Sequence, residues 1–81
     1  MKTPEFAREA VAAEARYGKQ LVAARSGIAE ALATGEMEIG ALVADVAVSR
    51  RIPQTVVHTA LSQMLRRRQL KDAGGVRVAL A

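Results

Sequence analysis

Hydrogen-bonding side chains recur at helical spacing within a segment that contains no internal glycine or proline. On a helix of 3.6 residues per turn, Thr55, Thr59 and Ser62 lie on one side, with His58 beside them and Gln54 in the first turn. The opposite side is aliphatic and is formed by Val57, Ala60, Leu61, Met64 and Leu65. Short polar side chains let a helix approach base edges closely, where they both donate and accept hydrogen bonds. The pattern predicts a helix in the major groove of duplex DNA, with base contacts from Gln54, Thr55, His58, Thr59 and Ser62.

Arginines stand at both ends of this segment. Arg50 and Arg51 precede it, and three consecutive arginines, Arg66 to Arg68, end it. A cation at the end of a helix is favoured by the helix dipole, but three in a row exceed what that effect requires. We therefore predict phosphate contacts from most of them and from two later cations, and we leave out Arg68 because it falls on the aliphatic side. The predicted phosphate-binding residues are Arg50, Arg51, Arg66, Arg67, Lys71 and Arg77.

Other kinds of chemistry find little support in the residue types. His58 is the single histidine and the chain has no cysteine, so a zinc site is not expected. His58 also lacks a plausible nucleophile or acid/base partner, and the pair Gly74-Gly75 is too short for a phosphate-binding glycine loop. We expect no enzyme, no metal and no cofactor, and no small-molecule ligand is apparent.

Charge is unevenly distributed along the 81 residues. Residues 1–49 contain five Lys/Arg and seven Asp/Glu, whereas residues 50–81 contain seven Lys/Arg and only Asp72, within a net charge of +4. A concentrated basic region suggests an anionic polymer as partner, although an ordinary solvated charge run is an equally good explanation of the composition alone. The single Phe, single Tyr and absent Trp argue against recognition of single-stranded RNA by stacking.

The N-terminal half reads as helix. Thr3, Pro4 and Glu5 form a helix start, and apolar residues then recur at spacings of three and four as far as Leu32, with Gly35 at the expected C-cap. Either one helix spans about residues 4–34 or two helices meet near Gly18. The alanine-rich residues 1–18 are predicted to form a helical arm that packs on a second copy of the chain or on a neighbouring surface, with a frayed tail as the alternative. Residues 19–81 are predicted to form the domain.

The remaining elements are short. Residues 36–39 alternate polar and apolar, which predicts a very short strand or an extended connector. Residues 41–47 form a second helix, and residues 48–52 form a turn. Pro53 is predicted as the first residue of the helix 53–68, and Val56, which fits neither of its faces, to pack against the turn. Residues 69–71 and 76–80 then pair as a hairpin around the turn 72–75. The predicted fold class is mainly α with a small β-hairpin.

This order resembles the winged helix-turn-helix DNA-binding superfamily over roughly residues 20–80. The similar segments are residues 42–50 for the first helix and turn, 55–61 for the recognition helix and 74–78 for the wing. Locally the chain looks most like bacterial regulators of the GntR type, in which a Val-Ser-Arg turn precedes the recognition helix. It departs from them in having Ala47 where many such turns have glycine, and in a connection from Ser49 to Val56 that is about three residues longer. Residues 24–39 are also similar, more weakly, to the helical start of actinobacterial integration host factors.

These observations predict a winged helix-turn-helix protein with an N-terminal helical arm that binds double-stranded DNA as a homodimer. We expect a transcriptional repressor, or an excisionase-like or nucleoid-associated factor, with the hairpin 70–80 on the backbone or in the minor groove. The alternative is a winged-helix module that binds another protein and does not read DNA. No apolar run approaches the roughly 18 residues that span a bilayer, and no signal-peptide core is evident. We therefore expect no membrane association and a bacterial or phage-encoded protein of the cytoplasm.

Overall fold

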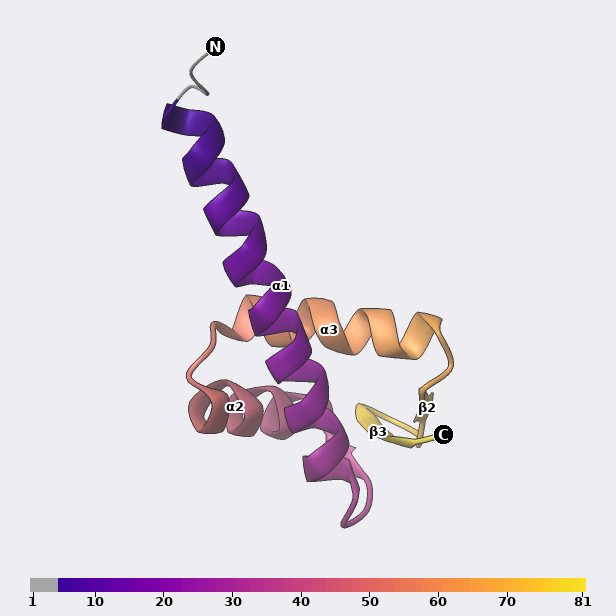
Figure 1. The fold of residues 1–81 in the computed structure, drawn as a ribbon. Helices are drawn as coiled ribbons and strands as arrows, with labels where there is room; N and C mark the ends of the chain where they lie inside the picture. Colours follow the sequence, from indigo (N-terminus) through magenta and orange to yellow (C-terminus); the bar gives the residue numbers. More distant parts are fainter. Residues whose placement is uncertain (1–4) are drawn as a thin grey trace.

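The computed structural model describes the backbone of residues 5–81 and the side chains of residues 15–81. Within this part of the chain, three helices pack together and a small antiparallel sheet lies at one edge of them (Figure 1). The helices are α1 (Glu5–Leu32), α2 (Ile39–Arg50) and α3 (Gln54–Arg66); the strands are β1 (Met37–Glu38), β2 (Leu70–Asp72) and β3 (Arg77–Leu80). The prediction of a mainly helical chain with a small hairpin is confirmed. The helix start predicted at Thr3 and Pro4 lies outside the described residues.

The N-terminal half is one helix and not two. α1 runs through Gly18 without a break and ends at Leu32, two residues before the predicted limit of Thr34. Gly35 then adopts a φ of 136°, and its N–H donates to the carbonyl of Leu32 at 3.1 Å. A glycine ends the helix here because residues with a side chain rarely adopt a positive φ.

α1 supplies one wall of the core. It crosses both α2 and α3 (Figure 1), and its C-terminal turns bury Ala24, Ile28 and Leu32 almost completely. These side chains recur at intervals of four, so one stripe of the helix faces the other two helices. The rest of the core comes from α2, α3 and the sheet, and includes Leu42, Val43, Val46, Val57, Ala60, Leu61, Met64, Leu70 and Val78.

The N-terminal part of α1 extends beyond this core. The molecule measures 54 × 24 × 18 Å, and its radius of gyration of 15.0 Å exceeds the roughly 12 Å expected for a compact chain of this length. Along the same stripe, exposure rises from 0% at Ala24 to 43% at Tyr17. α1 therefore leaves the body of the protein as a projecting arm (Figure 1).

The connection between α2 and α3 is shorter than predicted. The sequence predicts a turn at residues 48–52, but α2 continues through Val48 and Ser49 to Arg50, and only residues 51–53 connect it to α3. α2 keeps its helical spacing through the predicted turn, and Val48 lies on the solvent side of this helix, where it is 78% exposed. The turn predicted at residues 48–52 is therefore wrong for its first three residues, which belong to α2.

The limits of α3 also differ slightly from the prediction. Pro53 is extended (φ −62°, ψ 144°) and stands just before the helix, where its carbonyl accepts from the N–H groups of Val56 and Val57. The helix ends at Arg66 instead of Arg68, because Arg68 turns left-handed with a φ of 58°. The predicted helix was thus too long by one residue at the start and two at the end.

The sheet pairs strands that are far apart in the sequence. Its strand order is β1-β3-β2 with both pairs antiparallel, so the short strand before α2 pairs with the last strand of the chain. The predicted hairpin forms, but both strands begin one residue later than predicted, and Asp72 is the last residue of β2. In its turn the carboxylate of Asp72 accepts from the N–H of Gly74 at 2.8 Å, and Gly74 and Gly75 both have positive φ. This hairpin lies at the C-terminal end of α3 (Figure 1).

Gly27 allows α1 and α2 to pack closely. A Cβ atom at this position would lie 2.8 Å from Cγ1 of Val46 and 3.1 Å from Nε of Arg50. We expect Gly27→Ala to lower the free energy of unfolding by about 1–3 kcal/mol, because the overlap outweighs alanine's better helix propensity. Gly18→Ala is the matched control, since its Cβ would meet no described atom within 4 Å and should stabilise the protein by up to about 1 kcal/mol. Urea unfolding of both variants measures the difference, and equal shifts would contradict this packing.

Candidate nucleic-acid interface

α3 separates into an apolar and a polar side. Val57, Ala60, Leu61 and Met64 are buried as predicted, while Leu65 is half-buried. Val56, which we expected against the turn, is 5% exposed and belongs to the same core cluster as Ile52 in the turn. The core therefore includes the first turn of α3 and holds the N-terminal end of this helix against the body. The polar side of α3 faces solvent.

The five predicted base-contacting residues are not equally placed. Gln54, Thr55, His58 and Ser62 are exposed, whereas Thr59 is half-buried. The hydroxyl of Thr59 donates to the carbonyl of Thr55 at 3.0 Å, which commits its hydrogen to the helix backbone. Thr59 can therefore accept a hydrogen bond from a ligand but must break an existing one to donate. The other four side chains make no hydrogen bond with a described residue.

One contact beside the polar side was not foreseen from the sequence. Arg25 of α1 donates from Nη1 to Oε1 of Gln63 at 3.3 Å, which brings a cation from the N-terminal half next to α3. Both side chains are half-buried, so each is restrained by its neighbours. No local pattern predicts this pair, because the two residues are 38 positions apart and meet only where α1 crosses α3.

Four of the six predicted phosphate-binding residues are exposed and make no ion pair with described residues. Arg66 and Arg67 stand at the C-terminal end of α3, Lys71 follows on β2, and Arg51 precedes the N-terminal end of α3. A helix of 13 residues is about 20 Å long, so these cations lie at opposite ends of the polar side. The fold thus keeps Arg66, Arg67 and Lys71 at one end of α3 and leaves Arg51 at the other.

Two arginines occupy backbone positions that usually belong to glycine. Arg51 after α2 and Arg68 after α3 have φ values of 55° and 58°. In both cases the next residue's N–H closes the helix: Ile52 donates to Ala47, and Gln69 to Met64. A left-handed residue with a side chain costs about 1 kcal/mol relative to glycine. Both α2 and α3 are therefore followed by an arginine that is left-handed at a conformational cost.

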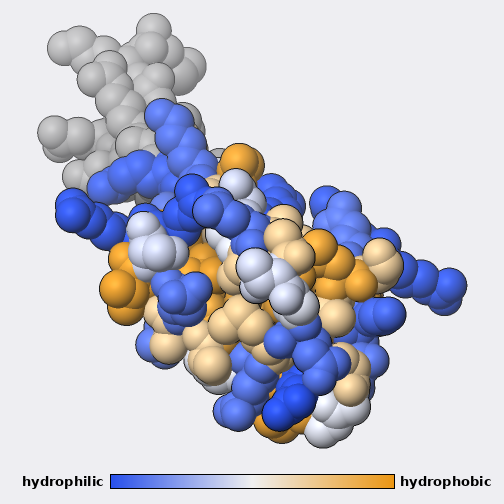
Figure 2. Space-filling model, turned by 90° about the horizontal axis from the view of Figure 1, so that it is seen from below, coloured by the Kyte–Doolittle hydropathy of each residue, from blue (hydrophilic) through white to orange (hydrophobic). Residues whose placement is uncertain are grey.

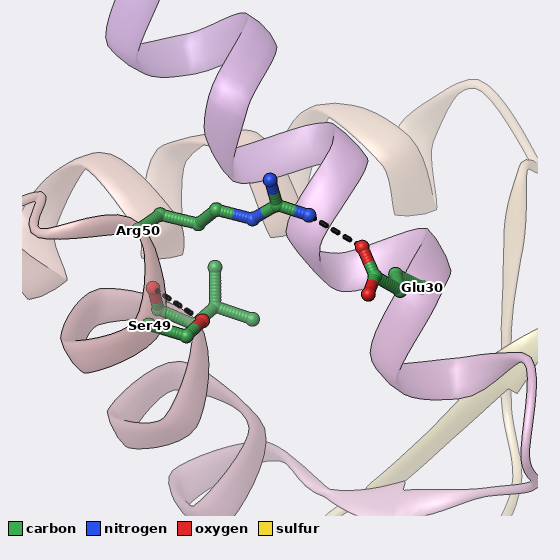
Figure 3. A network of polar contacts seen from close by, with 4 residues as sticks. Glu30, Ser49 and Arg50 are labelled. Carbon is green, nitrogen blue, oxygen red and sulfur yellow. Dashed lines mark hydrogen bonds and ion pairs between the residues drawn. The ribbon is translucent and has the colours of Figure 1, made fainter.

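The other two predicted phosphate-binding residues are paired with acids. Arg50 reaches back across α1, and its Nη2 lies 2.6 Å from Oε2 of Glu30 (Figure 3). Arg77 on β3 lies 3.0 Å from Oε1 of Glu36. Both acids are on segments that precede the basic half of the chain, so the pairs connect the acidic and basic halves. Such solvent-exposed pairs contribute roughly 0–1 kcal/mol, which a phosphate could replace at little cost.

The N-terminal end of α3 lacks an anion among the described residues. No described side chain caps it, and its first turn contains no acidic residue. The exposed N–H groups of a first helical turn carry partial positive charge and bind anions well. The partial positive charge of these N–H groups therefore adds to the charge of Arg51, which shortly precedes α3.

The described residues offer neither a metal site nor a membrane span. No three His, Cys, Asp or Glu side chains among residues 15–81 come together as metal ligands, and His58 stands exposed on α3. No helix in the described part is both long and apolar enough to cross a bilayer. Comparisons with protein-family models, with curated proteins and with solved structures found no match to this chain.

Proposed function

We propose that this chain is a small double-stranded DNA-binding protein of the winged helix-turn-helix type, with α3 as its recognition helix. The observation that carries the proposal is the polar side of α3. Exposed Thr55, His58 and Ser62 stand opposite a buried side, and cations lie at both ends of the helix. A helix fits the major groove, which is about 12 Å wide, and short polar groups reach the base edges there.

The arrangement of the elements supports this proposal. α2, the three-residue connection and α3 correspond to the helix-turn-helix, and β2 with β3 corresponds to the wing. The short strand β1 pairs with β3 at the other side of the sheet and so ties the segment before α2 to the hairpin. The short connection between α2 and α3, residues 51–53, supports this correspondence.

The cations divide into two groups, according to whether they already form an ion pair with an acid among the described residues. Arg51, Arg66, Arg67 and Lys71 are exposed and make no ion pair in the described part of the chain. Arg50 and Arg77 must first leave Glu30 and Glu36. We assign the first group to the initial contact with the duplex and the second to a closer complex in which phosphates replace the carboxylates. The biological role that fits is a repressor, an excisionase-like factor or a nucleoid-associated factor of the bacterial or phage-infected cytoplasm.

Salt dependence of duplex binding tests the function. If the six predicted cations each neutralise one phosphate, the slope of log affinity against log salt is expected to be about −5. Fluorescence anisotropy with a random-sequence duplex, followed by selection of bound sequences from a random pool, measures both the slope and any preference. Absence of duplex binding at low salt would refute the proposal. A slope near zero would refute the assignment of the cations.

A protein-binding module is the second candidate. The observation that favours it lies away from α3, in an open groove between α1 and α2. In this alternative the basic side of α3 is only a solvated surface. The two functions separate in the same experiment, because a protein-binding module has no reason to bind duplex DNA with a steep salt dependence.

A further inference from the structure

An open groove of about 780 Å³ runs between the C-terminal half of α1 and α2. Its floor is formed by small or flexible side chains, and its walls carry two acids and one arginine. The lining residues are Gly27, Glu30, Ala31, Thr34, Met37, Ala41, Asp45, Ser49 and Arg50. On the face seen from below, apolar surface lies over the middle and reaches the left edge, with hydrophilic side chains interspersed (Figure 2). Small floor residues let another helix approach closely.

The projecting arm of α1 is largely uncovered by the body of the protein. α1 has 28 residues and is about 42 Å long, well beyond the 24 Å width of the molecule. The exposed positions 15–19 and Val22, which is 60% exposed, receive little cover from the body. A helix segment without tertiary contacts is only marginally stable in water, so a packing partner for the arm would stabilise it.

The arm and the groove belong to one self-complementary stripe of α1. Arg16, Lys19, Ala23, Gly27 and Glu30 follow one another at spacings of three or four, so they share one side of the helix. The stripe is symmetric about Ala23: the cation Arg16 and the anion Glu30 are each seven residues from it. Two such helices in antiparallel orientation therefore place Arg16 of each beside Glu30 of the other.

We propose that two copies of this chain pair through antiparallel α1 helices, with the arm of each copy seated in the α1–α2 groove of the other. A two-fold axis passes near Ala23, where the small side chain permits close contact. The same surface serves both copies, so the assembly closes as a dimer. The dimer does not depend on the proposed DNA binding and can be tested without nucleic acid.

Charge complementarity identifies a second copy as the occupant. Arg16 and Lys19 are exposed and make no ion pair with a described residue, while the groove presents Glu30 at 77% side-chain exposure and exposed Asp45. Arg50 binds only Oε2 of Glu30, which leaves Oε1 for a second guanidinium (Figure 3). In the antiparallel register Lys19 falls level with Gly27, at the height where the groove presents Glu30 and Asp45.

Charge reversal in the full-length chain tests the dimer. Sedimentation equilibrium is expected to show a dimer for the unmodified protein. Arg16→Glu and Glu30→Arg should each raise the dimer dissociation constant at least about 100-fold, because the two-fold axis repeats each like-charge contact twice. The double variant Arg16→Glu with Glu30→Arg restores opposite charges and should restore the dimer. A monomeric unmodified protein, a Glu30→Arg dimer of unchanged affinity, or a double variant that stays monomeric would each overturn the proposal.

Two matched controls separate the groove from general effects. Glu38→Arg makes the same charge change at an exposed acid outside the groove and should leave the dimer intact. Ala41→Trp fills the groove and should abolish the dimer, whereas Ala44→Trp places the same side chain on the exposed side of α2 outside it. Circular dichroism verifies that each variant is folded. Equal effects of the two tryptophans would show that the arm does not occupy this groove.

Discussion

Replacing Arg66 and Arg67 together with glutamine is expected to weaken binding to duplex DNA by about 10- to 50-fold at physiological salt, whatever the sequence of the duplex. Both arginines are exposed at the C-terminal end of α3, where they would neutralise one phosphate each. The slope of log affinity against log salt should become shallower by about 2. Fold stability should hardly change, since both side chains lie outside the core.

The conservative pair Arg66→Lys and Arg67→Lys is the control. It keeps both charges, so it should retain the salt slope and most of the affinity, because phosphate binding depends mainly on charge. Anisotropy titrations at several salt concentrations compare the two double variants on a selected and on a scrambled duplex. If the glutamine pair binds like the unmodified protein, these arginines serve only to end the helix.

Features set by local periodicity were predicted well from the sequence. The buried side of α3, the exposed Thr55 and Ser62, and the hairpin around Gly74 all follow from spacing or turn chemistry within a few residues. The choice between one N-terminal helix and two was open because Gly18 weakens a helix without ending it. The structure contains a single helix there.

The ends of helices were harder to locate, and for a physical reason. Arg51 and Arg68 end α2 and α3 in the left-handed conformation, where the usual signal is glycine. Without a glycine, the pattern offered nothing to mark either end. The predicted turn therefore began too early, and the predicted α3 continued too far.

The partners of the cations could not be predicted either. Arg50 was expected at a phosphate but reaches Glu30, and Arg25 was not singled out although it reaches Gln63. Both contacts depend on how α1 crosses the other helices, which is a property of the tertiary fold. A charge run in the sequence shows how many cations are present, but it does not show which of them pair with a distant acid, as Arg50 and Arg77 do.

Replacing Ser62 with glutamate is the sharpest single test of α3 as a reading helix. Ser62 is exposed at the middle of the polar side. A carboxylate there would face bases and phosphates, so we expect the affinity for duplex DNA to fall at least about 100-fold. The folded protein should be unaffected or slightly stabilised, because the new carboxylate would stand four residues before Arg66, a favourable ion-pair spacing worth about 0.3–0.5 kcal/mol.

Ser26→Glu is the matched control, since Ser26 is an exposed serine on α1 that does not line the α1–α2 groove. It makes the same change in net charge and should weaken binding only slightly through long-range repulsion. Thr55→Ala removes a polar group without adding charge and should alter the preference among duplex sequences more than the affinity for all of them. Equal losses for Ser62→Glu and Ser26→Glu would mean that α3 touches DNA through charge alone or not at all. Unequal losses with an unchanged fold would place the duplex against the polar side of α3.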